Sequence, residues 1–238
     1  MKIKSQNIKN LTKKLPHPFA GPHANPRRIR TLENRLSKEY GPVKIRRLDP
    51  LDELILTILS QNTNDNNRDK AYSALRKQFP THEDILNAPL EDIENAIRPG
   101  GLAANKSRTI KGLLQRLKQT RGKLSLDYLG SMSTEDALHE LTSFPGVGLK
   151  TASVVLLFCF SRPIMPVDTH VHRLSRRLGL ASPKANPTQT AQILSAVTPK
   201  ELILPFHLHL IAHGKSICKS QKPACSICTI ADLCPSAQ

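Results

Sequence analysis

The stretch "LTSFPGVGLKTASVVLL", residues 141–157, joins two helical runs through a turn of sequence PGVG. The run after the turn is apolar all round, which predicts a central buried helix. Glycines in the turn leave backbone N–H groups uncovered at the start of that helix, and such groups form a small anion-binding nest. A phosphate of a DNA backbone fits this nest without base contacts. An ordinary helix–turn–helix link without a ligand is the alternative.

Lys150 stands in the first turn of this apolar helix, two residues past Gly148. The helix dipole and the apolar neighbours both disfavour a positive charge there, so they favour the neutral amine. A neutral lysine amine is a nucleophile that forms Schiff bases with carbonyl-like carbons. The alternative is a lysine whose ammonium group reaches solvent along the protein surface.

Asp168 directly precedes the next expected helix, in the segment "PIMPVDTHVHRL". Its commonest role at such a place is that of an N-cap. A carboxylate held at a helix N-terminus stays ionised. If it faces Lys150, it can take a proton from the ammonium and stabilise a developing sugar cation.

Helical patterns continue outward from this region in both directions. Asp49 and Pro50 form an N-cap and first helical residue, and apolar residues follow at helical spacing. Gly179 and Gly214 each follow an amphipathic or apolar run and are expected to end helices. No segment alternates as a strand does, so the fold class is all-α with short loops. A further helix should bury Ile110, Leu113, Leu114 and Leu117.

The chain of 238 residues carries a formal charge of +16, which favours a polyanionic partner such as nucleic acid. Its first 50 residues hold 13 Lys and Arg residues against three acids. Residues 1–26 are also rich in proline and are expected to form a mobile basic arm, either for binding or as a solvated tail. No segment has the length of a membrane helix or the pattern of a signal peptide, so we expect an intracellular protein without membrane contact.

Four cysteines lie close together near the C-terminus with the spacing C-x6-C-x2-C-x5-C. In an intracellular protein they are expected to be metal ligands, and four thiolates can hold one zinc ion or one iron–sulfur cluster. Three nearby histidines, at 207, 209 and 213, are interpreted as packing and hydrogen-bonding residues. The cysteines are Cys218, Cys225, Cys228 and Cys234.

The segments "FPGVGLKTASVVL" and "VDTHVHR", which place Lys150 18 residues before Asp168, resemble the endonuclease III family of helix-hairpin-helix DNA glycosylases. The resemblance covers about residues 27–236. It implies that Lys150 attacks C1′ of the damaged nucleotide and that Asp168 is the essential carboxylate. A Schiff base and β-elimination would then nick the strand 3′ to the lesion.

The resemblance also implies a two-domain fold, a six-helix domain and a cluster domain, with a DNA-binding cleft between them. The expected segments are the arm 1–26, an N-terminal piece of the cluster domain at 27–48, the six-helix domain at 49–163 and the cluster domain at 164–238. The cysteine spacing matches the family's [4Fe–4S] loop position for position, which implies that cluster. Lys219 and Lys222 on the loop are expected to reach DNA phosphates.

Two loops should fill the hole left when a nucleotide flips out of the duplex. In "LSQNTND", Asn62 takes the family's position for a polar amide, with Gln61 adjacent, and Asp65 matches an acid near the pocket. In "GGLAANKS", Leu102 is the apolar plug. The alternatives are a helix C-terminal amide for Asn62 and an inward-packing loop leucine for Leu102. Further DNA contacts are expected at Gly146, Gly148, Thr151 and His170.

These features predict a monomeric DNA glycosylase with AP-lyase activity, which removes oxidised or fragmented pyrimidines. Its expected partner is duplex DNA that contains a damaged base or an abasic site. The expected location is the cytoplasm of a prokaryote, or the nucleus or mitochondria of a eukaryote. The alternatives are a thymine/uracil mismatch or 5-methylcytosine glycosylase of the same fold, and a non-catalytic DNA-binding iron–sulfur module. An adenine-specific enzyme would need a catalytic glutamate in the helix before "LSQNTND". This alternative is rejected, because that helix offers Leu54, Ile55, Leu56, Thr57 and Ile58, and Glu53 lies too early.

Overall fold

The computed structural model describes residues 17–44 and 48–237. Within these ranges the chain is all-α, as predicted: it forms eleven α-helices and no strand. The chain divides into two compact units, and each is described on its own. Unit 1 combines the described parts of Met1–Arg46 and Ser161–Gln238, whereas unit 2 is the described part of Arg47–Phe160.

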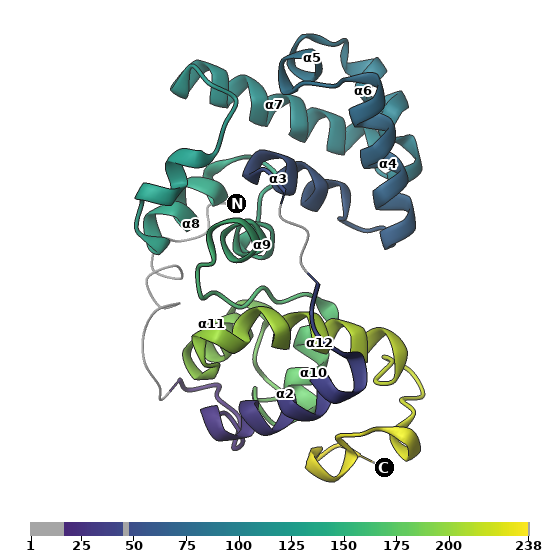
Figure 1. The fold of residues 1–238 in the computed structure, drawn as a ribbon, viewed down its shortest axis with the longest axis vertical. Coiled ribbons are helices and arrows are strands. Elements are labelled where there is room, and N and C mark those ends of the chain that lie inside the picture. The colour runs from purple at the N-terminus through teal and green to yellow at the C-terminus, as the bar shows by residue number, and fades with distance from the viewer. Residues whose placement is uncertain (1–16, 45–47, 238) are drawn as a thin grey trace. The chain divides into compact units, whose positions relative to one another are not determined.

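Unit 2 contains seven α-helices, one of them a short helix of six residues (Figure 1). The apolar helix after the hairpin packs against the first helix of the unit and against the helix before the hairpin. The helices are α3 (Pro50–Leu59), α4 (Asp65–Gln78), α5 (His82–Asn87), α6 (Leu90–Ile97), α7 (Ala103–Arg121), α8 (Thr134–Ser143) and α9 (Leu149–Phe160).

Local sequence signals explain where the helices of unit 2 begin. The Asp49 side chain accepts hydrogen bonds from the N–H groups of Leu51 and Asp52, and Pro50 is the first residue of α3. The start predicted for this helix is therefore confirmed. The apolar stripe predicted for α7 is also confirmed. Its buried members include Ile110, Leu113, Leu114 and Leu117.

Unit 1 is built from one helix near the N-terminus and three from the C-terminal part of the chain (Figure 1). The N-terminal helix packs along the last helix, which also contacts the helix that follows Asp168. The chain then ends in an irregular segment with two short 3₁₀ turns. The helices are α2 (Pro26–Tyr40), α10 (Thr169–Arg177), α11 (Pro187–Val197) and α12 (Ile203–Ser216).

The two glycines predicted to end helices behave differently. Gly179 follows the C-cap of α10 with φ +68°, so the predicted end is confirmed. Gly214 lies inside α12, which continues to Ser216, so the predicted end there is wrong. Packing explains this glycine, because a Cβ at Gly214 would lie 2.8 Å from atoms of His170 on α10. Glycine is needed here to let two helices approach, and it does not terminate either of them.

Residues 1–16 of the expected arm lie outside the described residues, and residues 17–25 pack within unit 1. Phe19, Ala20 and Ala24 pack on a small apolar cluster that includes Ala181. Ala20 and Ala181 also form an isolated antiparallel bridge. No described helix has the length and apolarity required to span a membrane.

Candidate DNA-repair site and cysteine cavity

The hairpin PGVG of unit 2 joins α8 to α9, and its two glycines are exposed. Gly146 has φ +78°, a conformation that side chains rarely adopt, and a Cβ there would lie 2.7 Å from Thr109 Cγ2. The turn therefore requires glycine both for its backbone conformation and for its close approach to α7. Thr151, one turn further on, is buried.

Lys150 is the second residue of α9 and is half-buried. It lies near Glu53, a buried carboxylate on α3. Burial raises the pKa of Glu53 above its usual value, while a hydrogen bond from Thr57 and the positive charges of Arg68 and Lys150 act in the opposite direction. The positive charge of Lys150 therefore acts on a buried acid, an interaction that was not predicted from the sequence.

Asp168 is the N-cap of α10 in unit 1. Its side chain accepts a 2.7 Å hydrogen bond from the Val171 N–H, which fixes the carboxylate at the positive end of the helix. Two residues later, His170 is half-buried; its Nδ1 lies 3.1 Å from the Arg173 guanidinium and its ring faces Gly214. The expected capping role of Asp168 is confirmed.

Two loops of unit 2 carry the residues predicted to enter the duplex. Asn62 is exposed in the loop after α3, and Leu102 is exposed by 53% immediately before α7. Both residues have left-handed backbone conformations, with φ of 52° and 50°. Asparagine adopts this conformation readily, whereas for Leu102 it is strained, and strained residues concentrate at functional sites. Gln61 instead donates a 3.2 Å hydrogen bond to the Gly146 carbonyl of the hairpin, which leaves Asn62 as the exposed amide. Asp65 begins α4 and pairs with Arg68 at 3.1 Å.

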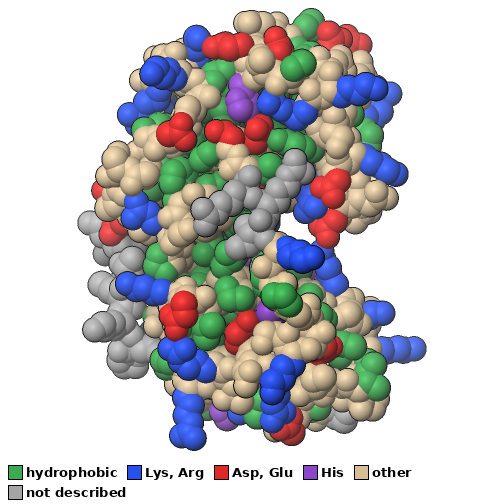
Figure 2. Space-filling view, in the orientation of Figure 1, with side chains coloured by type: hydrophobic (Ala, Val, Ile, Leu, Met, Phe, Trp, Pro, Cys, Tyr) green, Lys and Arg blue, Asp and Glu red, His purple; other side chains and the backbone are tan. Residues whose placement is uncertain are grey.

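Among the described residues of each unit, basic side chains do not form one continuous area on the face seen in Figure 2. Lys and Arg side chains are scattered over it, with acidic side chains between them. Lys219 and Lys222, expected to reach phosphates from the cysteine loop of unit 1, are exposed.

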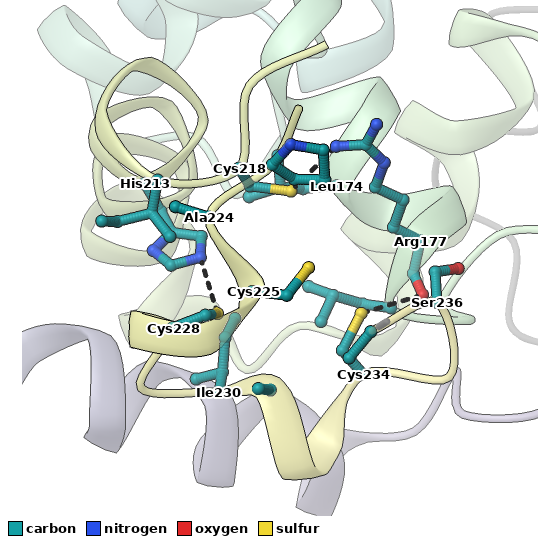
Figure 3. Close-up of a pocket in the computed structure, with 15 residues that line it drawn as sticks. Leu174, Arg177, His213, Cys218, Ala224, Cys225, Cys228, Ile230, Cys234 and Ser236 are labelled. Carbon is teal, nitrogen blue, oxygen red and sulfur yellow. Dashed lines mark hydrogen bonds between the residues drawn. The ribbon is translucent and has the colours of Figure 1, made fainter. Parts of the chain in front are cut away.

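The four cysteines predicted as ligands line a single cavity in unit 1 (Figure 3). Their sulfur atoms lie around its space, together with apolar side chains such as Leu174, Ile217 and Ile230. In the described part of the chain, no three of these sulfurs come within 4.8 Å of one another. Burial raises the pKa of the Cys228 and Cys234 thiols, and the neighbouring sulfurs add to the rise.

Two polar groups also reach these sulfurs, and neither contact was predicted from the sequence. The Arg177 guanidinium donates to Cys218 Sγ at 3.2 Å, and His213 Nε2 lies 3.4 Å from Cys228 Sγ. His213 Nδ1 in turn contacts the Tyr40 hydroxyl at 2.9 Å. His209 contacts Glu33 at 2.9 Å, so the interpretation of these two histidines as hydrogen-bonding residues is confirmed.

Comparison with known proteins identifies the family. Residues 55–200 match the model of the HhH-GPD superfamily base excision DNA repair proteins. An endonuclease III of Thermotoga maritima is 34% identical over 206 residues, which cover 87% of this chain and 92% of that protein. The chain belongs to the endonuclease III family. The family resemblance seen in the sequence is therefore confirmed.

Two further relatives extend this result. A protein of Arabidopsis thaliana, named as a DNA glycosylase, is 42% identical over 189 residues. The match covers 78% of this chain but only 64% of the plant protein. A solved structure of a trapped endonuclease III–DNA covalent intermediate is 30% identical with a TM-score of 0.75, covering 89% of this chain and 96% of that one.

Proposed function

We propose that this member of the endonuclease III family is a base excision repair DNA glycosylase with AP-lyase activity. Its substrate would be duplex DNA with an oxidised or fragmented pyrimidine. The observation that carries the proposal is Lys150, held in the first turn of α9 directly after the exposed glycines of the hairpin. The hairpin would bind a backbone phosphate on its N–H groups and so bring the amine to the flipped nucleotide.

Lys150 Nζ would form a bond with C1′ of the damaged nucleotide while the glycosidic bond breaks and the base leaves with a proton. The Asp168 carboxylate, fixed by its bond to the Val171 N–H, would accept a proton from the lysine and stabilise positive charge on the sugar. The C1′–O4′ bond of the sugar ring then breaks, O4′ takes a proton, and the nitrogen lone pair forms the C1′=N double bond of a protonated Schiff base. Loss of a 2′ proton from this Schiff base expels the 3′ phosphate. Water hydrolyses the remaining Schiff base and restores the free amine.

Cys218, Cys225, Cys228 and Cys234 would hold a [4Fe–4S] cluster, which supplies a structural centre for the loop. The cavity and its donor set fit this group. Sulfurs around a tetrahedral zinc, with Zn–S bonds of about 2.3 Å, lie roughly 3.8 Å apart. No three of these sulfurs are within 4.8 Å of one another, so their spacing favours the larger cluster. Iron, sulfide and zinc analysis of purified protein distinguishes the two.

The test is borohydride trapping on duplex oligonucleotides that bear thymine glycol, dihydrouracil, uracil, 5-methylcytosine or an abasic site. We expect a covalent band with the oxidised pyrimidines and the abasic site, and none with Lys150→Ala. Asp168→Asn should keep DNA binding and lose most of the trapping. A band confined to 5-methylcytosine would indicate the demethylating alternative. Base release from uracil or a mismatched thymine without trapping would indicate the mismatch glycosylase.

No trapping or base release from any duplex, with the cluster intact, would contradict the proposal and leave a non-catalytic DNA-binding module. That module would bind DNA equally well with and without Lys150 and Asp168. The comparison of wild type with the two variants in a binding assay therefore completes the test.

A further inference from the structure

Lys106 on α7 is a buried lysine that the proposed chemistry does not use. Its side chain is 3% exposed and shares the buried face of α7 with Ile110 and Leu113. Burying an ammonium group costs free energy unless hydrogen bonds compensate for the lost water. A leucine or methionine would fill this position without that cost, so the charge calls for a specific explanation.

Two hydrogen bonds made by the Lys106 ammonium group explain why a charged residue is buried here. Lys106 Nζ donates to the Leu59 carbonyl at 2.7 Å and to the Gly100 carbonyl at 2.8 Å. Leu59 is the last residue of α3, and Gly100 is the last residue of the 3₁₀ turn before α7. Carbonyls at helix ends lack a partner within the helix and favour a cation. A single buried amine therefore caps two chain segments at once.

These two segments lead directly into the two loops predicted to enter DNA. Asn62 comes three residues after Leu59, and Leu102 comes two residues after Gly100. Both loop residues are exposed and both have a left-handed backbone conformation. Leu102 is the strained one of the two, because asparagine adopts this conformation more readily than leucine. Strained conformations persist only where the surroundings hold them. The surroundings that the two loops share include the Lys106 amine.

We propose that Lys106 is a positioning residue for nucleotide flipping, which fixes the Asn62 loop and the Leu102 loop relative to each other so that both side chains enter the duplex together. The proposal rests on the proposed function for the roles of these two loops. A positioning role of Lys106 differs from a purely structural role in one measurable way. Lys106 should matter for extruding a stacked base and matter little for reaction at a site that has no base.

The experiment compares Lys106→Met with Lys111→Met. Methionine keeps the length of the side chain and removes the donors. Lys111 lies on the same helix and its amine also donates to a carbonyl, that of Ala88, which belongs to neither loop. Each variant is assayed on one duplex with thymine glycol and on the same duplex with a preformed abasic site. A 2-aminopurine opposite the lesion reports unstacking by its fluorescence.

Lys106→Met should lower the excision of thymine glycol about 10- to 100-fold, because small misplacements of positioning groups have effects of this size. Cleavage at the abasic site should fall by less than about threefold, and Lys111→Met should leave both rates near wild type. The ratio of the two activities in one preparation does not depend on how much protein is folded. If both activities of Lys106→Met fall equally, Lys106 supports only the fold and the proposal is overturned.

A double variant provides a second criterion. In a Leu102→Ala background, Lys106→Met should reduce excision by less than about threefold further, because the side chain that it positions is already absent. Full additivity of the two losses would contradict the proposal. If Lys106→Met does not fold, Lys106→Gln, which retains an amide donor, replaces it.

Failure of the proposed function would be distinguishable. A wild-type protein that neither excises nor cleaves would refute the enzyme, and the 2-aminopurine signal would then decide on Lys106 alone. A rise in fluorescence with wild type and Lys111→Met that is lost in Lys106→Met would support the positioning role. An equal rise in all three would overturn it.

Discussion

Both units of the protein hold irregular segments in place with cations from a neighbouring helix, but they use different cations. In unit 2, the compact ammonium of Lys106 binds two carbonyls at the roots of two loops. In unit 1, the forked guanidinium groups of Arg173 and Arg177, both on α10, bind the chain around the first cysteine. Arginine offers five donors in a fixed plane, so it can hold several carbonyls at once.

The contacts on the unit 1 side are more numerous. Arg173 donates to the Cys218 carbonyl at 2.8 Å and to the Gly214 carbonyl at 2.9 Å. Arg177 donates to the Lys219 carbonyl at 2.7 Å. The difference indicates two tasks. The arginines hold the chain around the first cysteine, whereas the lysine joins the roots of two exposed loops.

Replacing the arginine anchor should have the largest effect on stability. Arg173→Met removes hydrogen bonds from a charged donor to the carbonyls of Gly214 and Cys218, so we expect the free energy of unfolding to fall by about 2–4 kcal/mol. The proposed cluster should also be lost faster to an iron chelator, as followed by visible absorbance. Arg176 on the same helix is exposed, and Arg176→Met should change stability by less than about 0.5 kcal/mol. Equal effects of the two substitutions would mean that α10 does not anchor the loop.

Two glycines within helices, Gly214 and Gly112, should give effects of intermediate size on stability when each is replaced by alanine. Gly214→Ala should destabilise the protein by about 1–3 kcal/mol, because the new methyl group would meet His170 at 2.8 Å. Gly112 on α7 has open space where its Cβ would lie, so Gly112→Ala should stabilise by about 0.5–1 kcal/mol. Urea unfolding measures both changes. If the two signs are not opposite, the close packing of α10 on α12 is not what requires glycine at 214.

The smallest effect is expected at the strained leucine. Leu102→Gly should raise the free energy of unfolding by up to about 1 kcal/mol, because glycine adopts φ near +50° without the steric cost that leucine has. Excision of thymine glycol should fall in the same variant, because the apolar side chain is missing. Urea unfolding and an excision assay on one preparation test the pair of outcomes. A Leu102→Gly variant that is less stable than wild type would contradict the strain assigned to Leu102. A variant that excises thymine glycol at the wild-type rate would contradict its predicted role in DNA.

Much of this fold follows from short-range sequence signals. The apolar stripe of α7, the uniformly apolar α9 and the caps at Asp49 and Asp168 each depend on neighbours within one or two turns, and all four were predicted correctly. Gly214 was misread because a glycine after an apolar run usually marks a helix end. Here the deciding interaction is with His170, 44 positions earlier in the sequence and out of reach of local patterns.

In the candidate site, too, the features set by local sequence patterns were predicted, and the contacts between distant segments were not. The spacing of the four cysteines allowed them to be predicted as one ligand group, and the structure places them around one cavity. The contacts of Arg177 and His213 with their sulfurs join segments distant in sequence and were missed. Lys106 was missed although a signal existed: it stands in register with the apolar stripe of α7, four residues before Ile110. A lysine in a helix is ordinarily solvated, so only its burial in the structure revealed a role.

The central claim is that the amine of Lys150 is the nucleophile. It is tested most directly by trapping the protein on an abasic duplex with borohydride, digesting the adduct and locating the modified residue by mass spectrometry. The account predicts that the sugar remnant lies on the peptide containing Lys150, and on no other amine. An adduct on another lysine or on the N-terminus, with Lys150 unmodified, would contradict it.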